Sequence, residues 1–376
     1  MPVNVLRVAS AMATTALLLI GAPTLLHATT TAASASQPAH WPQWEAYKRH
    51  FIQRDGRVIE HSQQGRTTSE GQAYALFHAL VAGDRERFGR ILRWTENNLA
   101  GGDLASRLPA WLWGRRDDGS WGVIDANPAS DADMWLAWTL LEAGRLWRQP
   151  RLEKLGHAVL TQIEQREIAH LPHLGRMLLP GPEGFHHDQR RWKLNLSYLP
   201  VQLLRRFSRS GDRELWNEVL DNSLTLIRRA SRNGIVPDWV VYHADGRLEA
   251  VGDDANRIGY DAIRVYLWAG MLPPGDPARA VLLKALTRDC GDNLVASAAD
   301  AAGIRIAIGP LMKATGNHHC LGRLVRFVDS AWHRDLLGKP ARYYDQNLSL
   351  FALGWLDKRF AFTADGGLLL PHHETP

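Results

Sequence analysis

The chain is short of cysteine. Only Cys290 and Cys320 occur among its 376 residues, so disulfide bonds cannot form the framework of the fold. One bridge between them and two unpaired buried thiols are both compatible with the sequence. The run His318, His319 and Cys320 does not indicate a structural zinc site, because zinc requires spaced ligands and these residues are adjacent.

Long apolar runs are missing after the N-terminus. Arg7 is followed by an apolar stretch from Ala13 to Leu26 and then by small residues, which is typical of a secretory signal. Cleavage is expected after Ala28 or after Ala35. A membrane helix needs about 20 consecutive apolar residues, and no later segment offers them. We therefore expect residues 1–35 to be a signal peptide and the mature protein to be periplasmic or secreted.

Neither sign of charge dominates, and no linker divides the remaining chain. The 44 basic and 39 acidic residues are interspersed, whereas nucleic-acid-binding proteins concentrate basic residues in a patch or stripe. No Ser-, Gly- or Pro-rich segment and no block of charge interrupts residues 36–376. Although domains usually contain about 100–200 residues, one large domain is the better prediction here. Nucleic acid is excluded as a partner.

Helical periodicity fills the chain from Trp41 onward. Apolar residues recur three and four positions apart in residues 69–82 and again in 131–147. The same spacing predicts further helices near residues 86–99, 151–169, 198–210, 213–230, 260–270, 277–288, 304–315, 321–335 and 345–357. Short strand-like runs at 176–179 and 240–242 indicate hairpin insertions. This pattern predicts an all-α barrel of paired helices, with an active cleft where the loops gather at one end.

The loops between these helices are rich in Gly, Pro, Asp and Trp. They include the segments Trp111–Gly114, Asp117–Gly122, Pro180–Gly184 and Pro237–Trp239. The chain has 15 tryptophans, and we expect about half of them to be core residues. Those in the loops are harder to explain as core: Trp111, Trp113, Trp121 and Trp239. Because indole rings stack on the apolar faces of neutral sugars, these four are candidates for substrate binding.

Acidic residues open an apolar helical pattern at three points: Glu70, the pair Asp131 and Asp133, and Asp261. Hydrolysis of a glycosidic bond needs two carboxyls, an acid that protonates the departing oxygen and a base that activates water. They lie about 6.5–9.5 Å apart in inverting enzymes and closer in retaining ones. A general acid also needs a raised pKa, so desolvation or a neighbouring carboxylate must outweigh the helix dipole at Glu70.

Each acidic position has an ordinary structural alternative. These alternatives are a capping box at Thr67 and Glu70, a helix cap at Ser130 and Asp133, and a surface ion pair between Asp261 and Arg264. Residues two apart cannot share one helix face, so at most one of Asp131 and Asp133 should point deeply into a cleft. Asp133 is also a candidate for substrate binding. Composition and spacing leave open which carboxyls are catalytic.

Several motifs occur in a fixed order along the chain. They are Gly56–Ile59, Thr68–Gln72, Leu108–Gly114, Ala129–Ala137, Ser197–Pro200, Pro237–Val240 and Tyr260–Val265. Together, from about Trp41 to about Pro371, they resemble glycoside hydrolase family 8, the cellulase D family. The resemblance implies an (α/α)6 barrel with an open cleft and inversion at the anomeric carbon. It implies no metal or organic cofactor.

The resemblance also implies roles for individual residues. Glu70 matches the general acid of the family, and Asp261 matches the base that activates water. Asp131 matches a signature aspartate that has been described as a nucleophile; because inversion forms no covalent intermediate, we expect it to hold the sugar ring or support the water. Tyr198 and Arg264 match residues that close around the sugar at the cleavage point.

These features predict an exported endo-β-1,4-glucanase, a cellulase, that cuts internal bonds of a β-1,4-glucan chain. The resemblance is greatest to family members associated with bacterial cellulose synthase, which implies a role in cellulose biosynthesis. Direct contact with the synthase complex stays open, as does the oligomeric state. The alternatives are a hydrolase of xylan, chitosan or mixed-linkage glucan, and a glycan-binding scaffold whose carboxylates never react.

Overall fold

This computed structural model describes residues 40–188, 190–231, 236–251, 261–286 and 343–371. Some predictions fall outside these ranges: the signal peptide at 1–35, the helices at 304–315 and 321–335, and Cys290 and Cys320. Within the described ranges, no helix combines the length and the apolar character that crossing a membrane requires.

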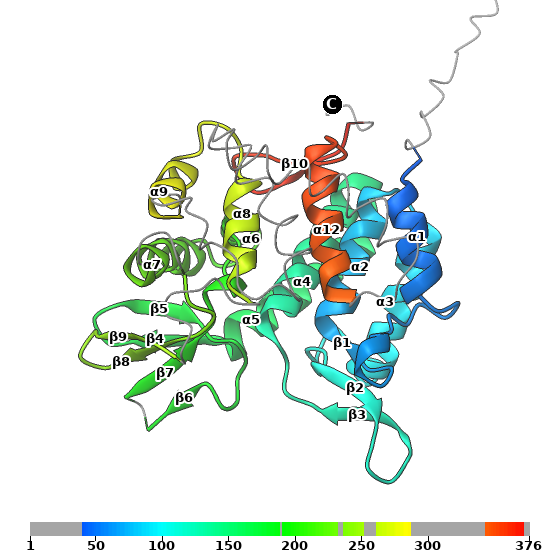
Figure 1. Cartoon of the computed structure of the whole chain (residues 1–376), viewed down its shortest axis with the longest axis horizontal. Coiled ribbons are helices and arrows are strands. Elements are labelled where there is room, and N and C mark those ends of the chain that lie inside the picture. The colour runs from blue at the N-terminus through cyan, green and yellow to red at the C-terminus, as the bar shows by residue number, and fades with distance from the viewer. Residues whose placement is uncertain (1–39, 189, 232–235, 252–260, 287–342, 372–376) are drawn as a thin grey trace, which may run out of the picture. The chain divides into compact units, whose positions relative to one another are not determined.

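Most of the inner helices are largely buried because their residues are apolar or small on nearly every side. In α8 all eight residues are buried, including its single charged residue, Arg264. The inner helices of the described ranges are α2 (Ser69–Val81), α4 (Ser130–Trp147), α6 (Val201–Ser210), α8 (Ile263–Gly270) and α12 (Tyr343–Leu356). Contacts run from α2 through α4, α6 and α8 to α12, and from α12 back to α2, so these helices close a ring (Figure 1).

Each inner helix packs against an outer helix. The outer helices are α3 (Arg85–Leu99) on α2, α5 (Pro150–Arg166) on α4, α7 (Arg213–Ala230) on α6, α9 (Pro277–Leu286) on α8 and α1 (Pro42–Phe51) on α12. Asp84 and Asp212 cap α3 and α7 by accepting backbone N–H bonds. This is the paired arrangement that the helical periodicity predicts. The sequence did not single out α1.

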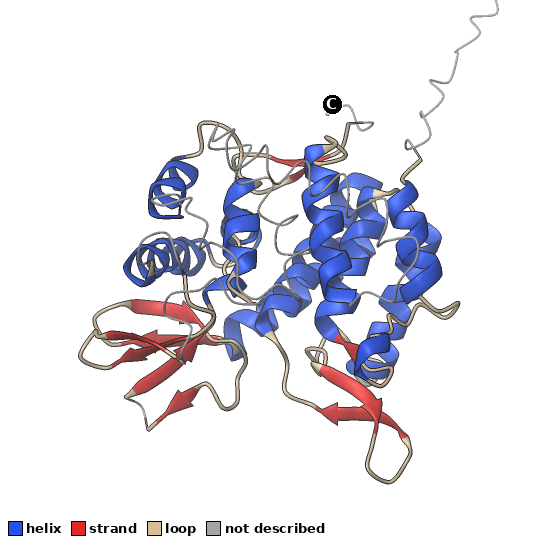
Figure 2. Ribbon diagram, in the orientation of Figure 1, coloured by secondary structure: helices blue, strands red, loops and turns tan. Residues whose placement is uncertain are grey.

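The strands form small antiparallel sheets (Figure 2). One sheet has the order β1 (Thr67–Thr68), β2 (Leu112–Arg115) and β3 (Trp121–Asp125). Another has the order β6 (His186–His187), β7 (Arg191–Leu194), β8 (Val240–His243) and β9 (Leu248–Ala250). Two hairpins are β4 (Ile168–Leu171) with β5 (Gly175–Leu178), and β10 (Ala361–Phe362) with β11 (Leu368–Leu369). Single 3₁₀ turns are η1 (His61–Gln63) and η2 (Leu196–Tyr198).

The hairpins predicted at 176–179 and 240–242 are confirmed, since β5 and β8 cover them. The prediction that Trp111–Gly114 and Asp117–Gly122 are loops is wrong in part, because β2 and β3 pair across them. Gly and Asp mark only the turn between these strands. The pairing of β2 with β1 depends on a contact between Thr67 and Trp113, which lie far apart in the chain.

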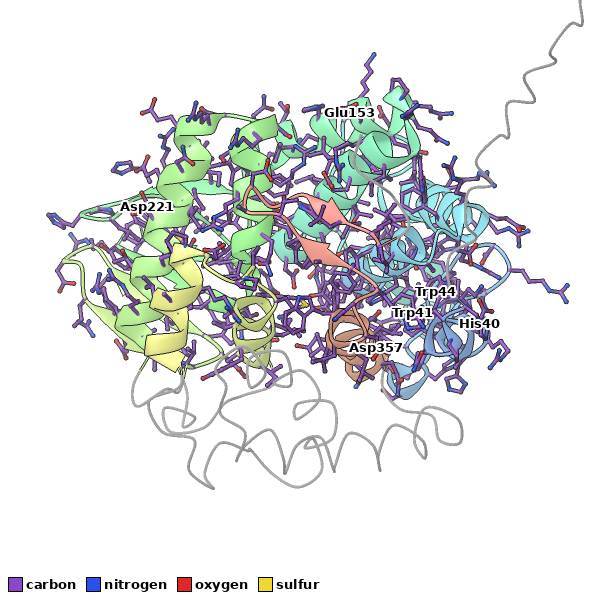
Figure 3. The ribbon with its side chains drawn as sticks, turned by 90° about the horizontal axis from the view of Figure 1, so that it is seen from above. His40, Trp41, Trp44, Glu153, Asp221 and Asp357 are labelled. Atoms are coloured by element: carbon purple, nitrogen blue, oxygen red, sulfur yellow. The ribbon has the colours of Figure 1, made fainter. Side chains whose placement is uncertain are left out.

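The two ends of the inner helices are covered differently. β1 leads directly into α2, and the sheets β1–β3 and β6–β9 lie near the end where the inner helices begin (Figure 1). The β10–β11 hairpin covers the opposite end, as the view from above shows (Figure 3). There the buried Glu142 pairs with Arg206 at 2.6 Å and accepts from the backbone N–H of Leu368 at 2.7 Å. The end at which the inner helices begin is therefore the expected position of the active site.

Candidate active site

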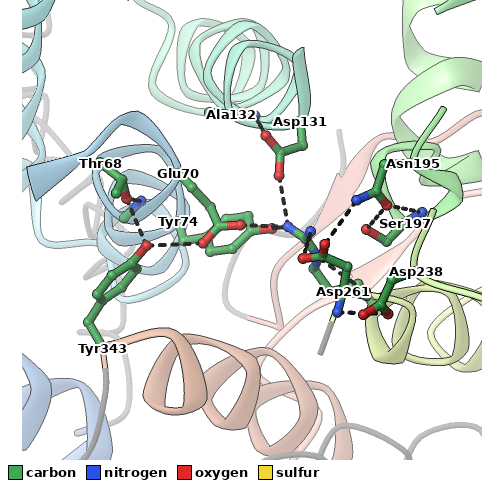
Figure 4. A network of polar contacts seen from close by, with 12 residues as sticks. Thr68, Glu70, Tyr74, Asp131, Ala132, Asn195, Ser197, Asp238, Asp261 and Tyr343 are labelled. Carbon is green, nitrogen blue, oxygen red and sulfur yellow. Dashed lines mark hydrogen bonds and ion pairs between the residues drawn. The ribbon is translucent and has the colours of Figure 1, made fainter. Parts of the chain in front are cut away.

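Arg264 gathers three carboxylates where the inner helices begin (Figure 4). Its Nη1 donates to Oε2 of Glu70 at 2.5 Å and to Oδ2 of Asp131 at 2.7 Å. Its Nη2 donates to Oδ1 of Asp261 at 3.1 Å. Glu70 lies in the first turn of α2, Asp131 in that of α4, and Asp261 just before α8. The structure thus joins the three acidic positions that the sequence singled out.

The members of this cluster differ in accessibility. The side chains of Glu70 and Asp261 are 16% and 25% exposed, whereas those of Asp131 and Arg264 are 5% and 1% exposed. A ligand can therefore touch Glu70 and Asp261 directly, while Arg264 connects them from beneath. The surface ion pair considered for Asp261 and Arg264 is ruled out, because Arg264 is buried.

Glu70 does not form the capping box considered for it. The N-cap of α2 is Thr68, whose Oγ1 accepts from the backbone N–H of Gly71 at 3.0 Å. Thr67 precedes the N-cap by one residue, and its Oγ1 donates to the carbonyl oxygen of Val58 instead. The side chain of Glu70 is free to point at Arg264, and its Oε1 accepts from Oη of Tyr343 at 3.2 Å. Tyr343 also bonds to Oγ1 of Thr68 at 2.8 Å, so the helix cap and the carboxyl share one partner.

The surroundings of Glu70 favour its protonated form. Burial is the largest cause, and the nearby charges of Asp131 and Asp261 act in the same direction, whereas Arg264 and Tyr343 favour ionisation. The net result raises the pKa of Glu70 to about 8. Burial also raises the pKa of Asp131, against the pull of Arg264. Glu70 therefore carries a proton at neutral pH, which a general acid requires.

Asp261 is held by partners on both carboxylate oxygens. Arg264 binds Oδ1, and Nδ2 of Asn195 donates to Oδ2 at 3.2 Å. The backbone N–H groups of Asp261 and Ala262 donate to Oδ1 of Asp238 at 3.1 and 2.7 Å, which fixes the chain as it enters α8. A partly exposed carboxylate with a fixed orientation suits a base that receives a proton from water.

Asp131 and Asp133 point in different directions, as their spacing predicts. The N-cap of α4 is Ala129, and no side chain caps this helix, so the cap considered at Ser130 and Asp133 is absent. Asp133 was a candidate substrate contact, but its side chain is fully buried and lies within hydrogen-bonding reach of Glu167. Burial raises the pKa of both carboxyls well above their usual range. Asp133 does not join the Arg264 cluster.

An aromatic row leads away from the cluster. Arg264 lies 5.2 Å from the ring centre of Tyr198, whose ring meets Trp239 edge-on with centroids 6.2 Å apart. Trp239 in turn lies parallel to Phe185, with centroids 6.0 Å apart. The guanidinium carbon of Arg264 also lies 5.5 Å from the ring centre of Tyr344. Flat rings beside a carboxylate pair suit the binding of sugar rings.

The other candidate tryptophans lie on or beside the β2–β3 hairpin. Trp113 and Trp121 stack on each other, with centroids 5.4 Å apart. Trp111 lines a pocket of about 1180 Å³ together with Arg107, Asn127 and other residues near the ends of α3 and α5. In the part of the chain that the structure describes, the rings close to Arg264 are those of Tyr198 and Tyr344, so the three tryptophans lie apart from the cluster.

The ranges that the structure describes contain no group of three or more His, Cys, Asp and Glu side chains arranged to hold a metal ion. In the cluster, the guanidinium of Arg264 supplies the positive charge that the carboxylates face. A second pocket, apolar and of about 580 Å³, lies where α8 and α12 end and is lined by Met271, Trp355 and Phe360 among others. It is at the opposite end of these helices from Arg264 and Tyr343.

The family model described as "Glycosyl hydrolases family 8" matches residues 22–358. The chain belongs to glycoside hydrolase family 8. An "Endoglucanase" of Xanthomonas axonopodis pv. citri (strain 306) is 43% identical over 375 residues, which cover 95% of this chain and 96% of that protein. An "Endoglucanase" of Escherichia coli (strain K12) is 40% identical over 336 residues, covering 88% and 90%.

Solved structures agree on the fold of this family 8 enzyme. The endo-1,4-D-glucanase from Vibrio fischeri ES114 superposes with a TM-score of 0.81 at 36% identity, and the match covers 88% of this chain and 99% of that one. A reducing-end-xylose releasing exo-oligoxylanase superposes with a TM-score of 0.61 at 18% identity, which shows the fold alone. The predicted (α/α)6 barrel is thereby confirmed, and the chain is a glycoside hydrolase.

Several residues of this family 8 site were not found from the sequence. They are Phe185, Asn195, Asp238, Tyr343 and Tyr344. Asp238 had a usable signal, because it lies in the motif Pro237–Val240, whereas Asn195 lies two residues before the motif Ser197–Pro200. Tyr343 had none, because its contact with Glu70 joins residues 273 positions apart.

Proposed function

We propose that this family 8 enzyme is an endo-1,4-β-glucanase that hydrolyses internal bonds of cellulose with inversion. The observation that carries the proposal is the pairing of Glu70 and Asp261 through one guanidinium. Hydrogen bonds of 2.5 and 3.1 Å to its two terminal nitrogens limit the separation of Oε2 and Oδ1 to at most roughly 8 Å. This limit admits the separation of about 6.5–9.5 Å that inversion uses.

The proposed reaction assigns each proton to one carboxyl. Glu70, with its pKa raised to about 8, gives its proton to the departing glycosidic oxygen as the bond to the anomeric carbon breaks. Water attacks that carbon from the opposite face and passes its proton to Asp261. Asp131 and Arg264 lie beneath and hold the two reacting carboxyls in place; Asp131 also places negative charge near the developing oxocarbenium ion. A β-linked chain then releases an α-anomer.

The substrate assignment rests on the named relatives. Those cited above are called endoglucanases, and the Vibrio fischeri structure is titled an endo-1,4-D-glucanase. The row Tyr198, Trp239 and Phe185 offers stacking surfaces for the rings of such a chain. Xylan, chitosan and mixed-linkage glucan are the competing substrates, and assays on these polymers beside carboxymethylcellulose discriminate among them.

We further propose that the enzyme is exported to the periplasm or beyond and acts in bacterial cellulose biosynthesis. The signal pattern in residues 1–35 supports export. The motif resemblance to members associated with cellulose synthase supports the role. Expression with and without residues 1–35 tests export: the full chain should appear in the periplasmic or medium fraction and the shortened chain in the cytoplasm. Retention of the full chain in the cytoplasm would contradict it.

Glu70→Gln and Asp261→Asn should each lower the rate of carboxymethylcellulose hydrolysis by at least about 10²-fold, because each removes one proton transfer. Release of reducing ends measures the rate, and circular dichroism should show unchanged helix content. Glu86→Gln, at an exposed carboxyl on α3, is the matched control and should behave as wild type.

Proton NMR of the first products tests inversion. The α-anomer should appear first, and early β-anomer would contradict the assignment. Near-normal activity in either variant would refute the roles of Glu70 and Asp261. Binding of cello-oligosaccharides with no new reducing ends from the wild-type protein would favour a glycan-binding scaffold instead.

A further inference from the structure

We propose that Tyr343 is a positioning residue for Glu70: its hydroxyl holds the carboxyl in place and stabilises the carboxylate that remains once the proton has left. This role rests on the proposed function, in which Glu70 gives its proton to the departing glycosidic oxygen. Its expected effect is on the rate of bond cleavage and on the pH dependence of that rate, and not on the binding of the glucan.

The hydroxyl of Tyr343 belongs to a chain of hydrogen bonds that ends on Glu70 (Figure 4). Oη carries one hydrogen, which it donates to Oε1 of Glu70 at 3.2 Å. The bond of 2.8 Å between Oη and Oγ1 of Thr68 must then run from Thr68 to Tyr343. Oγ1 accepts in turn from the backbone N–H of Gly71 at 3.0 Å. Every donor in this chain therefore points toward the carboxyl of Glu70.

The main chain of Tyr343 is fixed as well. Its backbone N–H donates to Oε2 of Glu60 at 3.0 Å. Glu60 is buried, and its Oε1 accepts from the backbone N–H and the hydroxyl of Ser62 at 2.9 and 2.6 Å. Tyr343 is thus tied to the segment before β1 through its main chain and to the start of α2 through its side chain. A donor that is already oriented needs no rearrangement when negative charge develops on Glu70.

The residue that follows Glu70 makes room for the tyrosine ring. A Cβ at Gly71 would lie 3.1 Å from Cε2 and 3.4 Å from Cδ2 of Tyr343, so the ring would have to move by a few tenths of an ångström. Gly71 lies in the first turn of α2, where alanine is the better helix former. The glycine therefore serves the approach of the ring and not the stability of the helix.

The groups around Glu70 act on its pKa in both directions. Burial raises it most, and the charges of Asp131 and Asp261 act in the same direction. Arg264 and the hydroxyl of Tyr343 lower it. Because Arg264 also binds the other two carboxyls, Tyr343 is the partner whose loss changes Glu70 without releasing them. Burial keeps the three further tyrosines that face Glu70 uncharged by raising their pKa values: Tyr74, Tyr198 and Tyr344.

Tyr343→Phe tests the proposal, because it keeps the ring and removes the hydroxyl. On carboxymethylcellulose, kcat should fall about tenfold, since a hydrogen bond to a developing charge is lost. KM should stay within about threefold of wild type. The alkaline limb of the kcat/KM profile should move up by about one pH unit, because losing the donor raises the pKa of Glu70.

Gly71→Ala separates positioning from stability. It should lower kcat about threefold by displacing Oη, whereas its unfolding midpoint in urea should not fall below that of wild type. Gly89→Ala on α3 is the matched control, because a Cβ at Gly89 meets nothing within 4 Å. Tyr242→Phe is the control for the lost hydroxyl, which on β8 donates to the carbonyl oxygen of Pro172 at 2.7 Å. Both controls should keep the wild-type kcat and pH profile.

A direct titration separates this proposal from the proposed function. Carbon NMR of protein labelled at the glutamate carboxyls follows Glu70, whose signal is the one missing from Glu70→Gln. Its pKa should be about 8 in wild type and higher in Tyr343→Phe. If the wild-type protein hydrolyses none of the polymers, the proposed function fails while this titration still reports on the contact. An unchanged titration of Glu70, an unchanged alkaline limb or a loss confined to KM would overturn the role of Tyr343.

Discussion

Two acids in the first turn of α4, Asp131 and Asp133, belong to groups that are stabilised in opposite ways. Asp131 belongs to the cluster in which Arg264 faces three carboxyls. Asp133, two residues along α4, lies beside the carboxyl of Glu167. None of the four carboxyl oxygens of this second pair has a hydrogen-bond partner among the residues that the structure describes. A cation organises the first group, whereas burial favours the protonated form of both acids in the second.

The difference shows that a raised pKa does not by itself identify a catalytic acid. Burial raises the pKa of Glu70 to about 8 and also raises the pKa of Asp133 well above its usual range. The side chain of Glu70 is 16% exposed, so a glycosidic oxygen can reach it, whereas Asp133 is fully enclosed. A perturbed pKa indicates function only where a substrate can collect the proton. The Asp133–Glu167 pair joins α4 to the end of α5 and has a structural role.

Removing Arg264 tests the cation-organised set and should have the largest effect. Arg264→Met leaves three acids without their common partner, and breaking a buried ion pair costs about 3–5 kcal/mol of unfolding free energy. We expect kcat/KM on carboxymethylcellulose to fall by at least about 10³-fold, because both reacting carboxyls lose their orientation. Urea denaturation and reducing-end assays measure the two effects.

Arg191→Met is the control for Arg264→Met. Arg191 pairs with Asp188 on the surface, and both side chains are 54% exposed, so its removal should cost less than about 1 kcal/mol. Arg264→Lys covers the case in which the methionine variant does not fold, since it keeps the charge but loses the forked geometry. Wild-type activity in the lysine variant would show that a point charge is sufficient.

Asparagine at Asp131 or at Asp133 compares the two sets directly. Asp131→Asn should lower kcat/KM by about 10²-fold, because it removes a charge close to the transition state. Asp133→Asn should stay within about threefold of wild type, because an uncharged amide of the same size fits the buried position and no substrate reaches it. Both variants replace one carboxyl oxygen with an amide nitrogen on the same helix, so they can be compared directly. A larger loss for Asp133→Asn would reverse the assignment of roles.

Much of the fold was predictable because it depends on local patterns. Apolar spacing of three and four located nine of the described helices, and short strand-like runs located β5 and β8. The β2–β3 hairpin was missed because its glycines and aspartates resemble a loop. β2 and β3 pair locally with each other, and β2 also pairs with β1, which lies far away in the chain.

The site was predictable only in part, for the same reason. The spacing of Thr67 and Glu70 predicted a capping box, which is absent because the N-cap is Thr68 and not Thr67. The spacing of Asp261 and Arg264 indicated a surface ion pair, whereas packing of α8 inside the ring buries the side chain of Arg264. Burial and long-range partners such as Tyr343 arise from tertiary structure, which spacing along the chain does not encode.

The raised pKa values of Asp133 and Glu167 predict how stability changes with pH, and this is the smallest of the expected effects. Their folded pKa values are raised above the unfolded values of about 4, so the folded state binds more protons and its stability falls as pH rises toward the folded values. The double variant Asp133→Asn, Glu167→Gln lacks both titrating groups. Its unfolding free energy in urea should therefore fall less than that of wild type between pH 5 and pH 8. Glu86→Gln, at an exposed carboxyl, should keep the wild-type dependence; a double variant that also keeps it would show that the pair is ionised in the folded protein.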